Sequence, residues 1–178
     1  MMTGPMTVLL DQADSSRMDD DGGVPTRLRT AAVGARPGLA AGSGRLSLAV
    51  ACGRKSFDGA WWPRSWRLAS ELPALVAALS DAGETVGRMS VNGDIWTDIP
   101  RRFTTPTGPS VRVSWYRSLD PHAVTLSGGY GPRLVLLVIP PQAAHEPAQE
   151  VLRMAADGRL VGPAGQILRT AGVTFPPE

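Results

Sequence analysis

The residues with the clearest chemical potential form one short segment, Asp58-Gly59-Ala60-Trp61-Trp62-Pro63-Arg64-Ser65. Adjacent Trp61 and Trp62 followed by Arg64 could form an aromatic floor with a cationic fork, which suits a planar ligand that carries a carboxylate or phosphate. We expect this segment to be a loop in which one indole enters the core and the other lines a cleft, with His122 completing the site. The alternative is structural: both indoles pin the loop to a sheet, and Arg64 pairs with Asp58.

A second arrangement would be catalytic. Ser65 could act as a nucleophile with His122 as its base and Asp58 or Asp120 as the orienting carboxylate. Ser65 lacks the G-x-S-x-G elbow that exposes a nucleophilic serine, and it is placed to act as the N-cap of the helix that follows. We therefore favour a non-catalytic module that binds a small anionic or planar ligand or a protein, and keep a small hydrolase as an alternative.

A third arrangement is a basic sheet face. Because side chains alternate along a strand, Arg112 and Tyr116 share a face, and Arg101 lies on the preceding predicted strand. Basic and aromatic groups on a sheet commonly hold single-stranded nucleic acid. The chain has 18 basic and 16 acidic residues, and this near balance argues against nucleic acid as a partner. Other members of such a face would be Arg102, Trp115 and Arg117.

No metal or cofactor is predicted. His122 and His145 are the only histidines and stand in no H-E-x-x-H motif, while Cys52 is the only cysteine and so excludes a Cys-based zinc site. The turn at residues 92–98 has neither the glycine nor the distal glutamate at the positions that a calcium loop requires. The glycine-rich residues 128–131 connect two predicted strands and do not open a helix, so they favour a hairpin turn over a phosphate loop.

The bulk composition indicates a small protein without a membrane segment. The chain has 178 residues, of which 43% are hydrophobic, which suits one domain with tails. The longest apolar run, Leu134–Ile139, is far too short to span a bilayer. The N-terminus carries no basic region followed by an apolar stretch, so we expect no signal peptide and a cytoplasmic location.

Hydrophobic periodicity predicts the elements that would position these residues. It predicts an α+β fold with a mostly antiparallel sheet of about five to six strands and two helices, in the order β-α-β-β-β-β-β-α. Residues 1–43 are predicted to be a disordered tail, 44–158 the domain and 159–178 a C-terminal tail. Pro73 is awkward inside the first helix, so either that helix bends there or a short turn precedes a helix that starts near Glu71. The predicted strands are Leu46–Val50, Thr85–Val91, Arg101–Thr105, Val111–Arg117, Ala123–Ser127 and Arg133–Ile139, and the predicted helices begin at Ser65 and Pro147.

Several segments together resemble an uncharacterised actinobacterial family of unknown function. They are Phe57–Ser65, Glu71–Leu75, Val113–Tyr116 and Asp120–Gly129, together with the apolar strand that ends at Pro140-Pro141. The resemblance covers roughly residues 45–156. It implies a small α+β domain and implies no activity, because none is assigned to that family.

Overall fold

A computed structural model describes residues 44–49, 55–105, 108–128 and 132–175. The predicted tail at 1–43 and Cys52 lie outside the described residues. The strands are β1 (Leu46–Leu48), β2 (Gly59–Trp61), β3 (Arg88–Asn92), β4 (Arg102–Phe103), β5 (Val111–Tyr116), β6 (Ala123–Ser127) and β7 (Leu134–Val138), and the helices are α1 (Leu68–Asp81), α2 (His145–Ala156) and α3 (Ala164–Thr170).

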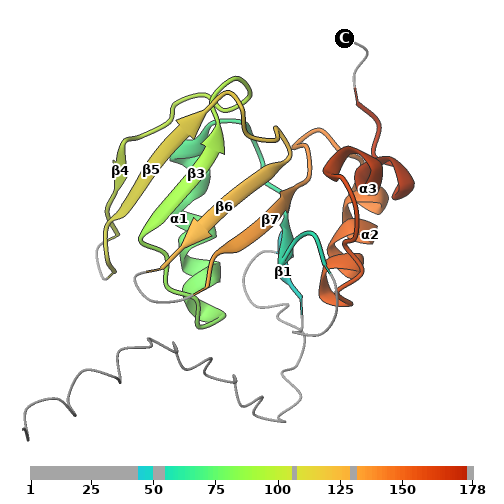
Figure 1. Cartoon of the computed structure of the whole chain (residues 1–178), viewed down its shortest axis with the longest axis horizontal. Helices are drawn as coiled ribbons and strands as arrows, with labels where there is room; N and C mark the ends of the chain where they lie inside the picture. The colour runs from blue at the N-terminus through green and yellow to red at the C-terminus, as the bar shows by residue number, and fades with distance from the viewer. Residues whose placement is uncertain (1–43, 50–54, 106–107, 129–131, 176–178) are drawn as a thin grey trace, which may run out of the picture. The chain divides into compact units, whose positions relative to one another are not determined.

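The strands form one mixed sheet in the order β1-β2-β7-β6-β3-β5-β4 (Figure 1). Two neighbouring pairs, β2 with β7 and β3 with β5, are parallel, and the other four pairs are antiparallel. The prediction of a mostly antiparallel sheet is therefore right for most pairs and wrong for these two. Both parallel pairs join strands that are not consecutive in the chain, so no hairpin turn in the sequence signals them.

One face of the sheet is covered by α1. Leu68, Leu72, Leu75 and Leu79 of this helix are buried against alternate residues of the strands. Pro73 lies within the helix on its exposed side, and the helix is continuous from Leu68 to Asp81. The strand residues of this core are Trp61, Met89, Val91, Val111, Val113, Val124, Leu126, Leu136 and Val138.

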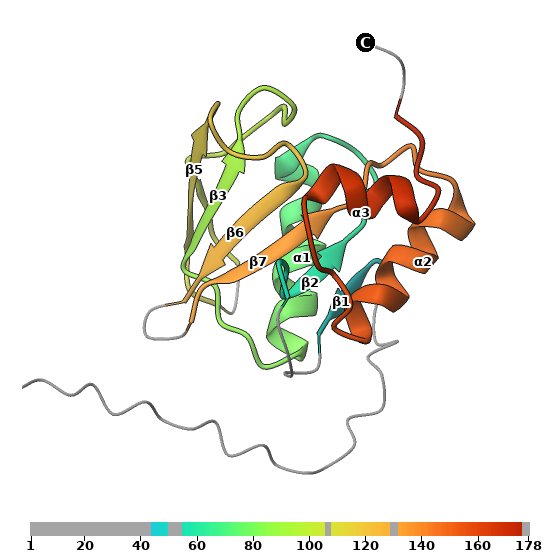
Figure 2. The same ribbon diagram turned by 45° about the vertical axis from the view of Figure 1, so that its right-hand side comes forward.

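The opposite face is covered by α2 and α3 at one end only. Their apolar residues pack with Ala60, Leu137 and Ile139 around β2 and β7, and α2 also contacts β1. The view in Figure 2 shows both helices at this end of the sheet, whereas β3 and β5 lie at the other end. The second face is thus half core and half open surface. Within the described residues, no helix has the length and apolar character needed to cross a membrane.

Two elements differ from the sequence prediction. Gly59–Trp61, predicted as part of a loop, forms β2, and residues 164–170, predicted as part of a tail, form α3. Gly59 allows this strand to lie in the sheet, because a Cβ atom there would collide with the carbonyl oxygen of Ser47. Both differences arise because long-range packing orders segments whose own periodicity is weak.

Candidate functional site

The structure places the two adjacent indoles in two different cores. Trp61 is 4% exposed and stacks on Trp96 beneath the α1 face, with ring centroids 5.3 Å apart. Trp62 is 6% exposed and belongs to the core under α2 and α3, where its ring meets the edge of His145 at 5.9 Å. Strand alternation in β2 and just after it sends the rings to opposite faces, so they form no common floor.

Arg64 does not serve as a cationic fork for these rings. The cation over Trp62 is Arg45, whose guanidinium carbon lies 4.1 Å from the ring centroid. The space that Arg64 shares with Trp61, Trp62 and Arg45 measures about 10 Å³. That volume holds about one water molecule. The alternative pairing of Arg64 with Asp58 is also absent among the described residues, because Asp58 pairs with Lys55 at 3.2 Å.

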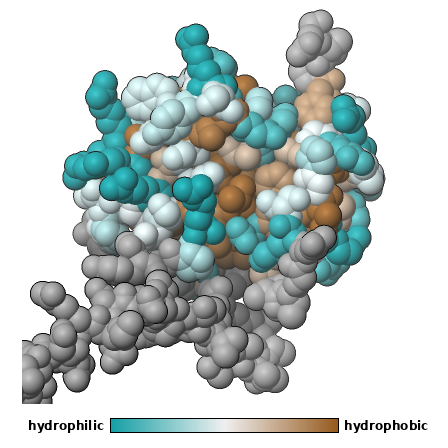
Figure 3. All heavy atoms as spheres, in the orientation of Figure 1, coloured by the Kyte–Doolittle hydropathy of each residue, from teal (hydrophilic) through white to brown (hydrophobic). Residues whose placement is uncertain are grey.

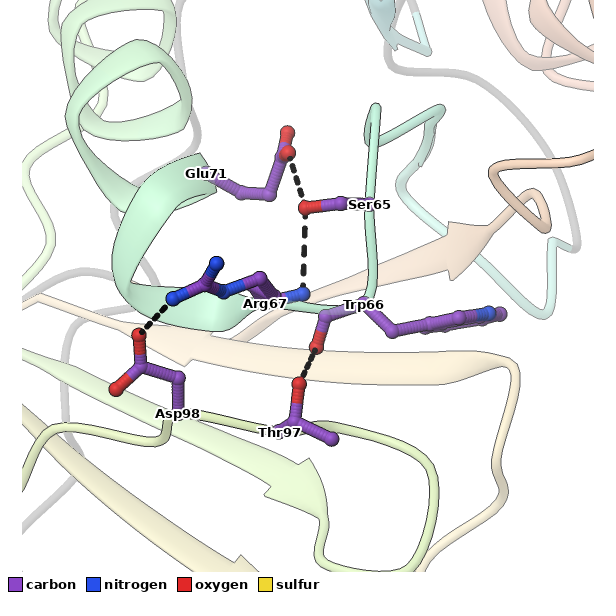
Figure 4. Close-up of polar contacts among 6 residues, drawn as sticks. All are labelled: Ser65, Trp66, Arg67, Glu71, Thr97 and Asp98. Atoms are coloured by element: carbon purple, nitrogen blue, oxygen red, sulfur yellow. Dashed lines mark hydrogen bonds and ion pairs between the residues drawn. The ribbon is translucent and has the colours of Figure 1, made fainter.

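Ser65 belongs to the start of α1, as Figure 4 shows. Its hydroxyl donates to Glu71 Oε1 at 2.9 Å and accepts the backbone N–H of Arg67 at 3.3 Å. The N-cap residue is Arg67, so the prediction of Ser65 as the N-cap is wrong by two residues. Both partners of the hydroxyl belong to the first turn of the helix or to its N-cap, and neither is a histidine. Ser65 therefore stabilises the helix start and has no base beside it among these partners.

His122 lies immediately before β6 and packs against Phe175, with ring centroids 5.0 Å apart. Its Nδ1 is buried and has no hydrogen-bond partner among the described residues. Burial lowers the pKa of His122 below its usual value of 6.5, although Asp120 and the backbone of Val138 act to raise it. The structure places this ring in a packed environment near the C-terminal segment.

The open half of the sheet carries a row of three arginines. Arg112 of β5 lies directly opposite Arg102 of β4 on one side and Arg88 of β3 on the other. Residues opposite each other point to the same face, and strands lie about 4.8 Å apart, so the row spans about 10 Å across three strands. All three side chains are exposed, and none forms an ion pair with a residue that the structure describes. We call this set the arginine row.

A row of hydroxyl groups runs beside the arginine row. Ser90 lies opposite Ser114 of β5 and Thr125 of β6. The three side chains are half-buried, and none of their hydroxyls has a hydrogen-bond partner in the described part of the chain. We call Ser90, Ser114 and Thr125 the hydroxyl row.

An aromatic ring follows the hydroxyl row along β5. Tyr116 is 53% exposed and lies opposite Asn92 of β3. Asn92 is not available to a ligand, because its side chain bonds the backbone of Asp94, Ile95, Arg117 and Leu119. Along β5, Arg112, Ser114 and Tyr116 therefore present a cation, a hydroxyl and an aromatic ring at successive positions on one face. The strand positions of this open face carry no acidic residue in β3, β4, β5 or β6.

A hollow of about 470 Å³ lies along the edge of β5, where the two-residue β4 leaves the longer strand uncovered. At this edge the guanidinium carbon of Arg101 lies 5.8 Å from the ring centroid of Trp115, which is 43% exposed. Figure 3 shows long hydrophilic side chains projecting from the side of the molecule where β4 and β5 lie. The hollow is lined by Arg101, Arg102, Arg112, Val113, Ser114, Trp115 and Tyr116.

The structure places residues of the predicted basic face together and adds residues that are distant in the sequence. Arg112 and Tyr116 lie on one face, while Arg101 borders the hollow from the edge and Arg117 pairs with Asp94 at 3.2 Å. Arg88 and the hydroxyl row are not part of the face predicted from the sequence, because only the pairing of β3 with β5 and β6 aligns them with Arg112. Among the described residues, no group of three His, Cys, Asp or Glu side chains could hold a metal ion.

Comparison with known proteins gives a family and no activity. No curated protein and no solved structure matches the chain. A family model described as a family of unknown function (DUF5994) matches residues 45–155. The match includes all seven strands, α1 and nearly all of α2, and it leaves α3 outside. The chain therefore belongs to the DUF5994 family of unknown function.

Proposed function

We propose that this protein is a non-catalytic, cytoplasmic binding module that holds single-stranded nucleic acid on the open half of its sheet. The observation that carries the proposal is the order of groups along β5, where Arg112, Ser114 and Tyr116 succeed one another on one face. A nucleotide presents phosphate, sugar and base in the same order. Successive same-face positions are about 7 Å apart, which is the scale of these parts of a nucleotide.

Charge complementarity supports the same ligand. The arginine row offers three guanidinium groups that have no carboxylate partner among the described residues. Guanidinium groups bind phosphate through paired N–H donors, and a polyanion that crosses the strands can meet all three. A duplex is a poorer fit, because a sheet face reads unpaired bases by stacking them on aromatic rings.

The Trp61/Trp62/Arg64 segment, which includes the end of β2, is not part of this proposal. Its two indoles already contribute to the two cores, and about 10 Å³ beside Arg64 leaves no room for a planar ligand. The nearly balanced charge of the chain is compatible with binding, because the strand positions of the open face hold the three arginines of the arginine row and no acidic residue.

The test measures the affinity of the protein for a labelled twelve-uridine strand at a series of salt concentrations, with fluorescence anisotropy as the readout. Three phosphate contacts predict a slope of log K against log salt of about −2, since each contact on a single strand adds about −0.7. Arg112→Gln should weaken binding and make the slope shallower by about 0.7. Tyr116→Ala should weaken binding about tenfold or more through lost stacking and leave the slope unchanged.

The matched control is Arg169→Gln, which removes the same charge from an exposed position on α3. This variant should bind like the wild type, because α3 lies at the opposite end of the sheet (Figure 2). Absence of binding at about 50 mM salt, or equal losses from Arg112→Gln and Arg169→Gln, would contradict the proposal.

A further inference from the structure

We infer that the open face recognises the ribose 2′-hydroxyl, so that its ligand is RNA rather than DNA. This inference rests on the proposed function and adds the class of nucleic acid. Its basis is the hydroxyl row, whose member Ser114 lies on β5 between the arginine assigned to phosphate and the tyrosine assigned to base.

The hydroxyl row has the chemistry that a ribose requires. Ser90, Ser114 and Thr125 come from three neighbouring strands, so the row runs parallel to the arginine row and extends one strand further, to β6. Each side chain can donate one hydrogen bond and accept two, as can a 2′-hydroxyl. The three hydroxyls make no hydrogen bond to any residue that the structure describes, so their bonding capacity is directed to the open face.

The placement of the row also matches the geometry of a nucleotide chain. A strand whose phosphates follow the arginine row from β4 to β3 runs across the sheet, and its sugars then pass over Ser114 and Ser90. Deoxyribose would leave these half-buried hydroxyls facing a C–H group, and a polar group that is covered without a partner is costly. The face therefore discriminates through the hydroxyls that a DNA strand would leave unpaired.

The experiment compares twelve-residue oligouridine with twelve-residue oligodeoxyuridine, which differ only in the 2′-hydroxyl. At equal low salt the wild type should bind the ribose form about tenfold more tightly, the equivalent of one or two net hydrogen bonds. The triple variant Ser90→Ala, Ser114→Ala and Thr125→Val should lose this preference while its affinity for the deoxy strand stays the same. Ser80→Ala, an exposed hydroxyl on α1, is the matched control and should keep the preference.

The outcomes separate the inference from the proposed function. Equal binding of both strands, or a preference that the triple variant retains, overturns the ribose inference and leaves the nucleic-acid module standing. Binding of neither strand by the folded protein overturns both. If circular dichroism shows the triple variant unfolded, Ser114→Ala alone replaces it, and a preference undiminished in that variant counts against the inference.

Discussion

At the residue scale, aromatic side chains serve different roles according to their place on the sheet. Trp62 lies in the core under α2 and α3, and its indole N–H has no partner in the described part of the chain, which marks the ring as packing mass. Tyr116 stands more than half exposed on an open face. The exposed ring is therefore the better candidate for stacking, although the tryptophan pair is the more conspicuous feature of the sequence.

His122 makes stability depend on pH. Burial holds its pKa below 6.5 in the folded chain, so the unfolded chain binds the proton more readily. The stabilisation that comes from keeping His122 neutral is fully present above pH 6.5. It is lost as the pH falls through 6.5 towards the lower pKa of the folded state. We expect the free energy of unfolding, measured by urea denaturation, to fall across this range of pH.

The control variants for this prediction are His122→Gln and His145→Gln. The first should flatten the fall in stability, because the group that titrates differently in the two states is gone. The second removes the other histidine of the chain, so a comparison of the two variants shows whether the fall in stability belongs to His122. A wild type whose stability rises on acidification, or a His122→Gln profile equal to the wild-type profile, would refute the assignment.

At the element scale, α1 is fixed at its start by groups from both sides. The backbone N–H groups of Leu68 and Ala69 donate to the carbonyls of Thr97 and Asp98 at 2.9 and 3.1 Å. The buried carboxylate of Glu71 accepts the Arg64 N–H at 3.0 Å as well as the Ser65 hydroxyl. The bonds to Thr97 and Asp98 satisfy donors that a helix start otherwise leaves without partners. The bonds to Glu71 tie the segment after β2 to the helix.

Glu71→Gln should therefore lower the free energy of unfolding by about 1–3 kcal/mol, because an amide cannot accept both hydrogen bonds and presents an N–H₂ group to one donor. Urea denaturation followed by tryptophan fluorescence measures the change. Asp81→Asn is the control in the same helix: it is exposed at the C-terminal end, where an acidic residue gains nothing from the helix dipole. Equal effects of the two variants would show that Glu71 is not the anchor.

The sequence predicts elements with strong local signals and misses those without them. The antiparallel pairing of β6 with β7 and the helix that follows Ser65 are confirmed. β2 is missed because it pairs in parallel with β7, where Gly59 lies opposite Leu136. The site shows the same dependence on long-range pairing. Arg112 and Tyr116 share a strand and can be predicted from its alternation, whereas Arg88 joins them only through a parallel pairing.

At the scale of the whole described chain, one half of a sheet face is buried in the second core and the other half is exposed. The helices α2 and α3 cover β1, β2 and β7 and complete a second core. The strands β3, β4 and β5 present the arginine row and Tyr116 on the uncovered remainder of the same face. This arrangement predicts that substitutions in the second core change stability without changing binding at the proposed site.

Leu168→Ala tests this separation and the status of α3. Leu168 is fully buried in the second core, although it lies in a segment whose sequence alone indicates a tail. Its truncation should lower the free energy of unfolding by about 2–5 kcal/mol, because a buried leucine leaves both lost contacts and a cavity. Arg169→Ala at the next, exposed position should cost about 0.5 kcal/mol or less.

At a temperature where the Leu168→Ala variant is still folded, it should bind the labelled oligouridine with wild-type affinity, because α3 covers the other half of the face. A loss of stability no larger than that of Arg169→Ala would mean that residues 164–170 do not pack as a helix of the core. A large loss of affinity in the folded variant would mean that the covered and open halves of the sheet are coupled. The helix outside the family match would then take part in binding as well as in stability.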